Sequence, residues 1–102
     1  MMTSDKSTIL NNMLHDDMID FLYFYRDLLK TYEVTDVDSG KEIAEDLLEL
    51  QKELHQKMVG NENNEEWKVL SDFHYDFRQI RRRILNDTGR LAMKLKREKS
   101  NG

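Results

Sequence analysis

Apolar side chains recur at the three- and four-residue spacing of an α-helix in three separate segments of this chain, and no proline interrupts any of them. The four glycines include the last residue, so few positions disfavour a helix through backbone entropy. We find no convincing strand pattern, which would need polar and apolar residues to alternate. The sequence therefore predicts an all-α fold in which residues 1–102 form a single helical domain, an antiparallel three-helix bundle with a long, basic C-terminal helix.

The three helices are expected at about residues 7–33, 40–59 and 64–98. The first has a wide apolar face made of Leu14, Met18, Phe21, Tyr25, Leu28 and Tyr32, widened by Leu22, Leu29 and Phe24. The second has a face made of Ile43, Leu47, Leu50, Leu54 and Met58. The third has a stripe made of Leu70, Phe73, Phe77, Ile80 and Ile84, which keeps its phase to Thr88, Leu91 and Leu95. Each helix thus has an apolar face to bury against the other two.

Two sequence signals mark the ends of the helices. Ser39 with Glu42 three residues later matches a capping box, which predicts that the second helix begins there, and Gly60 favours its end. Further along, Asn86–Gly89 reads "NDTG" and puts four weak helix formers together. The unbroken phase of the apolar stripe favours a continuous third helix, and a break at Asn86–Gly89 is the alternative.

Charge is divided unevenly along the chain. Residues 1–77 carry seven basic and eighteen acidic side chains, a net charge of −11, whereas residues 78–102 carry nine basic and two acidic ones, a net charge of +7. A cationic amphipathic helix of this kind can bind nucleic acid phosphates, an anionic membrane surface or an acidic protein, or can simply be a soluble helix end. The candidate basic face consists of Arg78, Arg81, Arg82, Arg83, Arg90, Lys94, Lys96 and Arg97.

A second candidate surface is acidic. It is expected opposite the apolar stripe of the second helix and consists of Glu42, Glu45, Asp46, Glu49 and Glu53. Like charges one turn apart destabilise an isolated helix by roughly 0.2–0.5 kcal/mol per pair. A solvated helix face is the favoured interpretation. The alternative is a docking face for a basic partner, including the basic C-terminal segment of a second copy.

Four side chains depart from the polar–apolar pattern. Ile19 and Tyr23 fall one turn apart on the side of the first helix away from its main stripe, which suggests a second apolar interface, for example that of a homodimer. Asp17 projects into the apolar stripe of the first helix, and Arg81 lies at the margin of the stripe of the third. One prediction is an ion pair between these two residues. The alternative is that Arg81 lays its stem on the core and keeps its head in water.

The sequence gives little support to metal binding. The chain has no cysteine, which excludes disulfides and thiolate sites, and its three histidines lack zinc-binding spacing. His74 is expected to be a partly buried core histidine. The segment "DVDSGKEIAED" resembles a calcium-binding loop, but its glycine, Gly40, falls at position 5 instead of 6, and Leu47 takes the place of the bidentate glutamate. We therefore expect a polar turn, no metal ligands and no cofactor.

Catalysis is also not indicated. Glu42 and Glu45 form one E-x-x-E motif, but the E-x-x-D motif that a metal-dependent all-α nucleotide hydrolase needs on a following helix is missing. No catalytic residue is predicted, and we expect no enzymatic activity. Such a hydrolase is the distant alternative.

The pattern as a whole favours a small helical protein–protein interaction module with an adaptor or regulatory role. Its partner is expected to be a macromolecule, in first place a protein. The alternative is a nucleic-acid-binding protein that contacts phosphates through its basic C-terminal helix. No apolar run is long enough to span a membrane, and no signal-like apolar segment begins the sequence, so a cytoplasmic (intracellular) location is expected.

Overall fold

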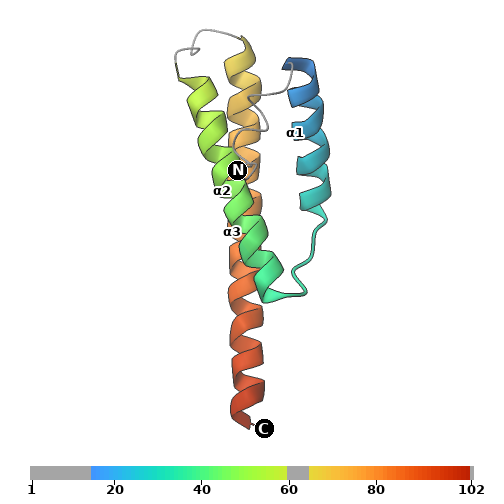
Figure 1. The fold of residues 1–102 in the computed structure, drawn as a ribbon, viewed down its shortest axis with the longest axis vertical. Helices are drawn as coiled ribbons and strands as arrows, with labels where there is room; N and C mark the ends of the chain where they lie inside the picture. The colour runs from blue at the N-terminus through green and yellow to red at the C-terminus, as the bar shows by residue number, and fades with distance from the viewer. Residues whose placement is uncertain (1–14, 60–64, 102) are drawn as a thin grey trace, which may run out of the picture.

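The computed structural model describes residues 15–59 and 65–101, and these form three helices: α1 (His15–Lys30), α2 (Val37–Met58) and α3 (Glu65–Asn101). In Figure 1 the chain runs down α1, returns up α2 and runs down α3. No strand occurs in these two ranges, so the predicted all-α fold is confirmed. The predicted start of the first helix and the predicted cap at Gly60 lie outside the described residues.

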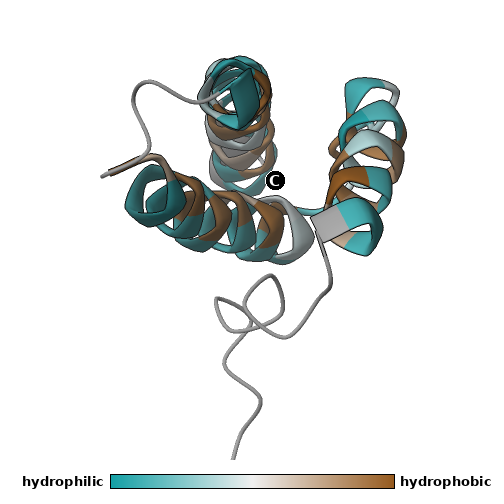
Figure 2. Ribbon diagram, turned by 90° about the horizontal axis from the view of Figure 1, so that it is seen from above, coloured by the Kyte–Doolittle hydropathy of each residue, from teal (hydrophilic) through white to brown (hydrophobic). Residues whose placement is uncertain are grey.

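The core lies between the three helices, with the largest interface between α2 and α3. Viewed down the bundle, much of the hydrophobic ribbon of α1 and α2 faces the space between the helices (Figure 2). The buried apolar side chains are Met18, Leu22, Leu29, Ala44, Leu47, Leu50, Leu54, Leu70, Phe73, Phe77, Ile80 and Ile84. The predicted stripes of α2 and α3 are therefore the faces that the bundle buries.

The face of α1 that is buried is narrower than the sequence indicates. Met18, Leu22 and Leu29 are buried, but Leu28 is 53% exposed and Phe24 is 66% exposed. The prediction that these last two side chains join the core is wrong. The physical reason is that α1 packs much less closely than α2 and α3 pack on each other, so within residues 15–59 and 65–101 no other helix covers an arc this wide.

Helix α2 begins earlier than predicted because Asp36 caps it. The Asp36 backbone is extended, and its carboxylate Oδ2 accepts hydrogen bonds from the Ser39 backbone N–H and from the Ser39 hydroxyl, each at 2.9 Å. These hydrogen bonds hold the pKa of Asp36 below its ordinary value. The predicted capping box at Ser39 and Glu42 is wrong, since the helix already begins at Val37 and both the backbone N–H and the hydroxyl of Ser39 donate to Asp36.

Helix α3 runs without a break through Asn86–Gly89, as the phase of its apolar stripe predicts. Thr88 is buried, and its hydroxyl donates a hydrogen bond to the carbonyl oxygen of Ile84 at 2.7 Å. That bond satisfies the hydroxyl inside the helix, so this weak helix former does not end it. The alternative of a separate last helix is wrong.

Gly40 near the start of α2 lies against Thr88 of α3. A Cβ atom on Gly40 would collide with the Thr88 side chain and would lie 3.1 Å from Cγ1 of Val34. Only glycine allows the two helices to approach this closely here. Beyond this contact α3 continues alone, past the ends of the other two helices (Figure 1).

Candidate interaction surface

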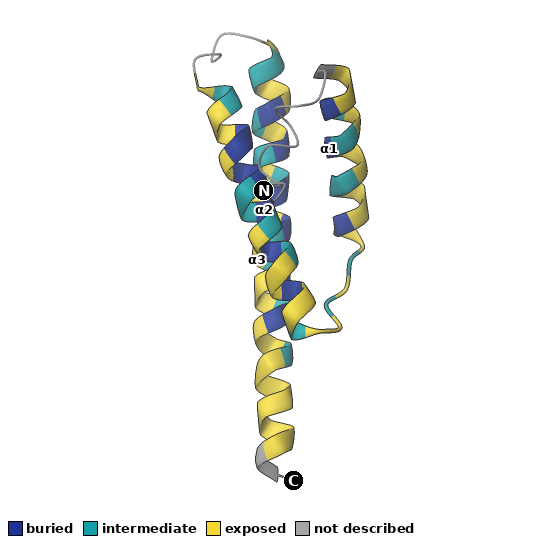
Figure 3. Ribbon diagram, in the orientation of Figure 1, coloured by how far each residue is buried: buried dark blue, intermediate teal, exposed yellow. Residues whose placement is uncertain are grey.

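The free end of α3 is the most exposed helical surface in the described structure. We call residues 89–99 the overhang; at 1.5 Å per residue it is about 15 Å long. Leu91 is half-buried, and every residue from Ala92 to Lys99 is exposed, which Figure 3 shows as an almost wholly yellow segment. A surface of this kind is available to another molecule along its whole length.

The overhang is both basic and apolar. Its charged residues are Arg90, Lys94, Lys96, Arg97, Lys99 and Glu98, a net charge of +4. Leu91 and Leu95 continue the stripe of Ile84 and Thr88, and Leu95 is 44% exposed. We call Leu91 and Leu95 the apolar strip of the overhang. By helical periodicity, cations flank the strip on both sides, so the overhang is an exposed amphipathic helix.

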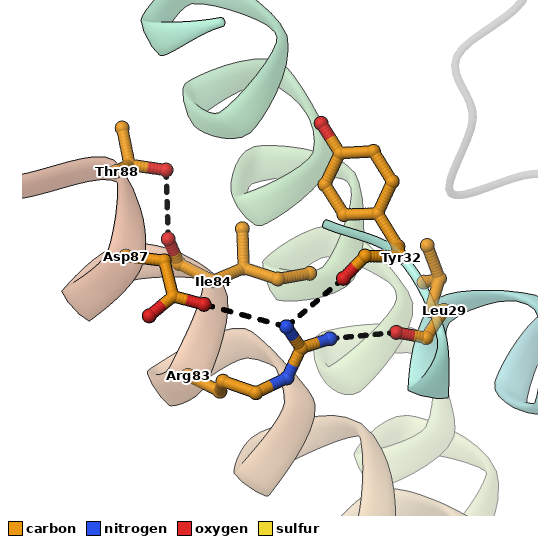
Figure 4. A network of polar contacts seen from close by, with 6 residues as sticks. All are labelled: Leu29, Tyr32, Arg83, Ile84, Asp87 and Thr88. Atoms are coloured by element: carbon orange, nitrogen blue, oxygen red, sulfur yellow. Dashed lines mark hydrogen bonds and ion pairs between the residues drawn. The ribbon is translucent and has the colours of Figure 1, made fainter. Parts of the chain in front are cut away.

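Arg83 belongs to the bundle rather than to a binding face. Its guanidinium donates to the carbonyl oxygens of Tyr32 at 3.0 Å and Leu29 at 2.8 Å, and it lies 3.4 Å from the Asp87 carboxylate (Figure 4). The Leu29 carbonyl lies in the last turn of α1 and also accepts the Tyr32 backbone N–H at 3.3 Å, and the Tyr32 carbonyl lies just past the end of the helix, where the helix dipole favours a cation. Arg83 is therefore the C-terminal cap of α1, and its predicted place on the basic face is corrected.

Arg81 also makes a hydrogen bond within the bundle. Its Nε donates to the carbonyl oxygen of Ala44 in α2 at 3.2 Å, whereas Asp17 is exposed. The predicted ion pair between Asp17 and Arg81 does not form, because Asp17 lies in the first turn of α1 and faces solvent. An ion pair that does link α1 and α3 joins Arg26 Nη1 to Asp76 Oδ2 at 3.1 Å.

The other predicted basic residues are exposed, but they do not form one patch. Arg78 and Arg82 lie along the bundled part of α3, whereas Arg90, Lys94, Lys96 and Arg97 lie on the overhang. The structure thus concentrates the accessible positive charge on the overhang, and that part of the predicted basic face is the one that could meet a partner.

The acidic face of α2 is only partly accessible. Glu42 and Glu45 are exposed, Asp46 and Glu49 are half-buried, and Glu53 is only 2% exposed. The prediction that Glu53 faces solvent is wrong. Its position is one turn from Leu50, at the edge of the buried face, and that face is wider than the apolar residues alone indicate because Gln51 is buried as well.

Ile19 and Tyr23 face α3 rather than the far side of α1. Ile19 is half-buried against the core, and the Tyr23 ring meets Phe73 edge to face, with centroids 4.8 Å apart. They line an open cleft of about 470 Å³ between the N-terminal halves of α1 and α3, together with Asp16, Asp20, Glu66 and Val69. The predicted location of this apolar pair is therefore wrong, but the residues do line a hollow that opens to solvent. We call it the α1–α3 cleft.

His55 of α2 and His74 of α3 line a second hollow, of about 360 Å³. Their ring centroids are 6.4 Å apart. Burial lowers the pKa of His74 below its ordinary value of 6.5, and the charges of His55 and Arg78 lower it further. His74 is half-buried, as predicted for a core histidine.

Among the described residues, no group of three or more His, Asp or Glu side chains is arranged to hold a metal ion. Nor is any described helix both long enough and apolar enough to cross a membrane. Comparison with protein-family models, curated proteins and solved structures found no match to this chain. The overhang and the α1–α3 cleft are therefore the two surfaces of the described structure that indicate a function.

Proposed function

We propose that this protein is a non-catalytic, intracellular interaction protein that docks its α3 overhang on an acidic surface of a partner protein. The observation that carries the proposal is the apolar strip: Leu91 and Leu95 run between cations on a helix that leaves the bundle, and Leu95 is 44% exposed. An amphipathic helix in a groove buries its apolar residues and pairs its flanking charges with the rim. A surface that binds a partner protein without catalysing a reaction suits an adaptor or regulatory role.

A protein partner fits this surface better than nucleic acid does. Phosphate binding needs cations but gains nothing from exposed leucines, whereas a protein groove does. Arg81 and Arg83 donate to backbone carbonyls within the bundle, which leaves fewer cations for phosphates. Residues 1–88 carry eleven basic and nineteen acidic side chains, a net charge of −8, and this charge would repel a nucleic acid that approached the bundle.

The proposal is tested by photo-crosslinking in the native cell. A photoreactive amino acid replaces Ala92, which is exposed at the edge of the apolar strip, and in a control chain it replaces Lys68, which is exposed on the opposite half of α3. We expect the Ala92 probe to capture an acidic protein that the Lys68 probe does not capture. Adding Lys94→Gln with Leu95→Gln should lower the yield at least tenfold, because these changes remove both a cation and the exposed leucine.

Two outcomes would overturn the proposal. One is a crosslink from the Ala92 probe to DNA or RNA whose yield falls steeply with salt, which is the behaviour of a phosphate-binding helix. The other is a protein crosslink that Lys94→Gln with Leu95→Gln leaves unchanged. Circular dichroism of each variant establishes that its helices are intact before the yields are compared.

A further inference from the structure

The α1–α3 cleft has a composition that complements the overhang. Asp16 and Asp20 on α1 are exposed at the rim, and Glu66 of α3 adds a third carboxylate. Ile19, Tyr23 and Val69 supply apolar lining, and Tyr23 and Val69 keep about half and about a third of their surface exposed. The cleft is therefore an acidic hollow with an apolar floor. It can accept an amphipathic helix whose leucines pack on the floor and whose flanking cations face the rim.

The dimensions of the two surfaces also agree. The α1 side of the cleft extends from Asp16 to Tyr23, which is about 10 Å of helix at 1.5 Å per residue. Residues Leu91–Arg97 of the overhang cover about 9 Å by the same measure. Leu91 and Leu95 are one turn apart, as are Ile19 and Tyr23 on α1, so the two apolar pairs can lie along each other.

The overhang cannot enter the cleft of its own molecule. Glu66 and Leu91 belong to the same unbroken helix, and their separation of 25 positions holds them about 37 Å apart at 1.5 Å per residue. The molecule is 57 Å long, with the cleft toward one end of α3 and the overhang at the other (Figure 1). Only a second molecule can bring the two surfaces together.

We infer that the α1–α3 cleft receives the overhang of a second copy of this chain, so that molecules associate head to tail. Leu91 and Leu95 pack on Ile19, Tyr23 and Val69. Arg90, Lys94 and Arg97 face the carboxylates of the rim. This inference rests on the proposed function of the overhang and names its acidic partner surface as the cleft of another copy.

A head-to-tail contact has a consequence that a symmetric dimer lacks. Each molecule uses two different surfaces, so wild-type chains extend into longer assemblies or close into rings. A molecule that loses its cleft keeps its overhang, and a molecule that loses its overhang keeps its cleft. An equimolar mixture of two such variants can form one contact and stops at a dimer.

Sedimentation equilibrium of the full chain tests the inference with two variants. Val69→Lys places a cation on the cleft floor at an exposed helical position, and Lys94→Gln with Leu95→Gln removes the central cation and leucine of the overhang. We expect the mean mass of the wild-type protein to rise above its monomer mass of 12.2 kDa with concentration, and to rise less at high salt. Each variant alone should stay monomeric, and their mixture should reach twice the monomer mass.

A second measurement leaves the apolar residues of both surfaces unchanged and replaces one charged residue on each. The chain has no cysteine, so Asp20→Cys in one sample and Arg97→Cys in another place single thiols in the cleft and on the overhang. A short bismaleimide linker should join these two chains to each other in high yield. It should join Arg97→Cys at least tenfold less to Lys52→Cys, whose thiol lies on the exposed surface of α2.

The inference is overturned if the wild-type protein stays monomeric at every concentration in low salt. It is also overturned if the wild-type protein associates but the variant mixture does not, or if the Lys52→Cys control crosslinks as well as Asp20→Cys. A monomeric protein whose Ala92 probe still captures another acidic protein would end this inference and leave the proposed function standing.

Discussion

Arg83 caps the C-terminal end of helix α1, although it lies more than fifty residues further along the chain than the carbonyls it binds. A guanidinium carries donors in a rigid fork and can therefore reach two carbonyl oxygens at once. The sequence offers one hint of this cap, namely that Arg83 is a cation on the third helix, next to two other arginines in "RRR". Nothing local distinguishes Arg83 from Arg82, which is exposed. The distinction depends on which of the two faces the end of α1.

Replacing Arg83 with glutamine is expected to destabilise the protein by about 1–3 kcal/mol, since it leaves two helix-end carbonyls without their charged donor. Arg83→Lys should fall between wild type and Arg83→Gln, because an ammonium cannot bridge both oxygens. The free energy of unfolding in urea measures the effect. The matched control is Arg82→Gln, which should change stability by less than about 0.5 kcal/mol. Equal effects of the two arginine-to-glutamine changes would contradict the assigned cap.

At Gly40 the close approach of α3 limits which residue α2 can carry. The sequence presents Gly40 as part of a polar turn, and the structure places it in the first turn of a helix that Asp36 caps. Thr88 lies against it, so the start of α2 and the last bundled turn of α3 are held at close approach. This contact sets the point at which the overhang begins.

Gly40→Ala is expected to destabilise the protein by about 1–3 kcal/mol, because the added methyl group collides with Thr88. Gly89→Ala is the control: nothing lies within 4 Å of a Cβ there, so the change should stabilise the helix by about 0.5–1 kcal/mol. Thermal unfolding followed by circular dichroism gives both signs. Combining Gly40→Ala with Thr88→Ala should recover part of the loss, and strictly additive losses would mean that the two side chains do not compete for the same space.

Charge and pH act on the molecule as a whole. The acidic residues gather in the bundle and the accessible cations on the overhang, so the molecule carries its two signs at different places. The pH also affects His74 within the bundle, because burial lowers the pKa of its side chain. As the pH falls, His74 is therefore protonated in the unfolded chain before it is protonated in the folded one.

The stability of the protein is expected to fall as the pH drops below about 6.5. Above that value His74 is neutral in both the folded and the unfolded chain, and its lowered pKa has no effect. Between 6.5 and the lower pKa of the folded state, only the unfolded chain is protonated, which favours unfolding. Urea midpoints measured from neutral to mildly acidic pH should decline less steeply for His74→Gln than for wild type. Parallel declines would show that His74 does not contribute.

How far the sequence predicts this protein depends on the range of the interaction. Periodicity placed the stripes of α2 and α3 correctly and carried α3 through "NDTG", because helix formation and amphipathic burial depend on neighbours three and four residues apart. It failed for Phe24, Leu28 and Glu53, since the width of a buried arc depends on how closely other helices pack. The placement of Ile19 and Tyr23 failed for the same reason.

The sequence by itself determined three helices, the faces of two of them and the basic, amphipathic nature of the last segment. Only the tertiary structure decided that Arg81 and Arg83 serve the bundle, that the overhang begins after Thr88 and that an acidic cleft opens between α1 and α3. The physical reason is one of distance along the chain. A helix forms from local hydrogen bonds, whereas the partners of the half-buried Arg83 guanidinium and the shape of a cleft depend on residues about fifty positions away, which only packing brings together.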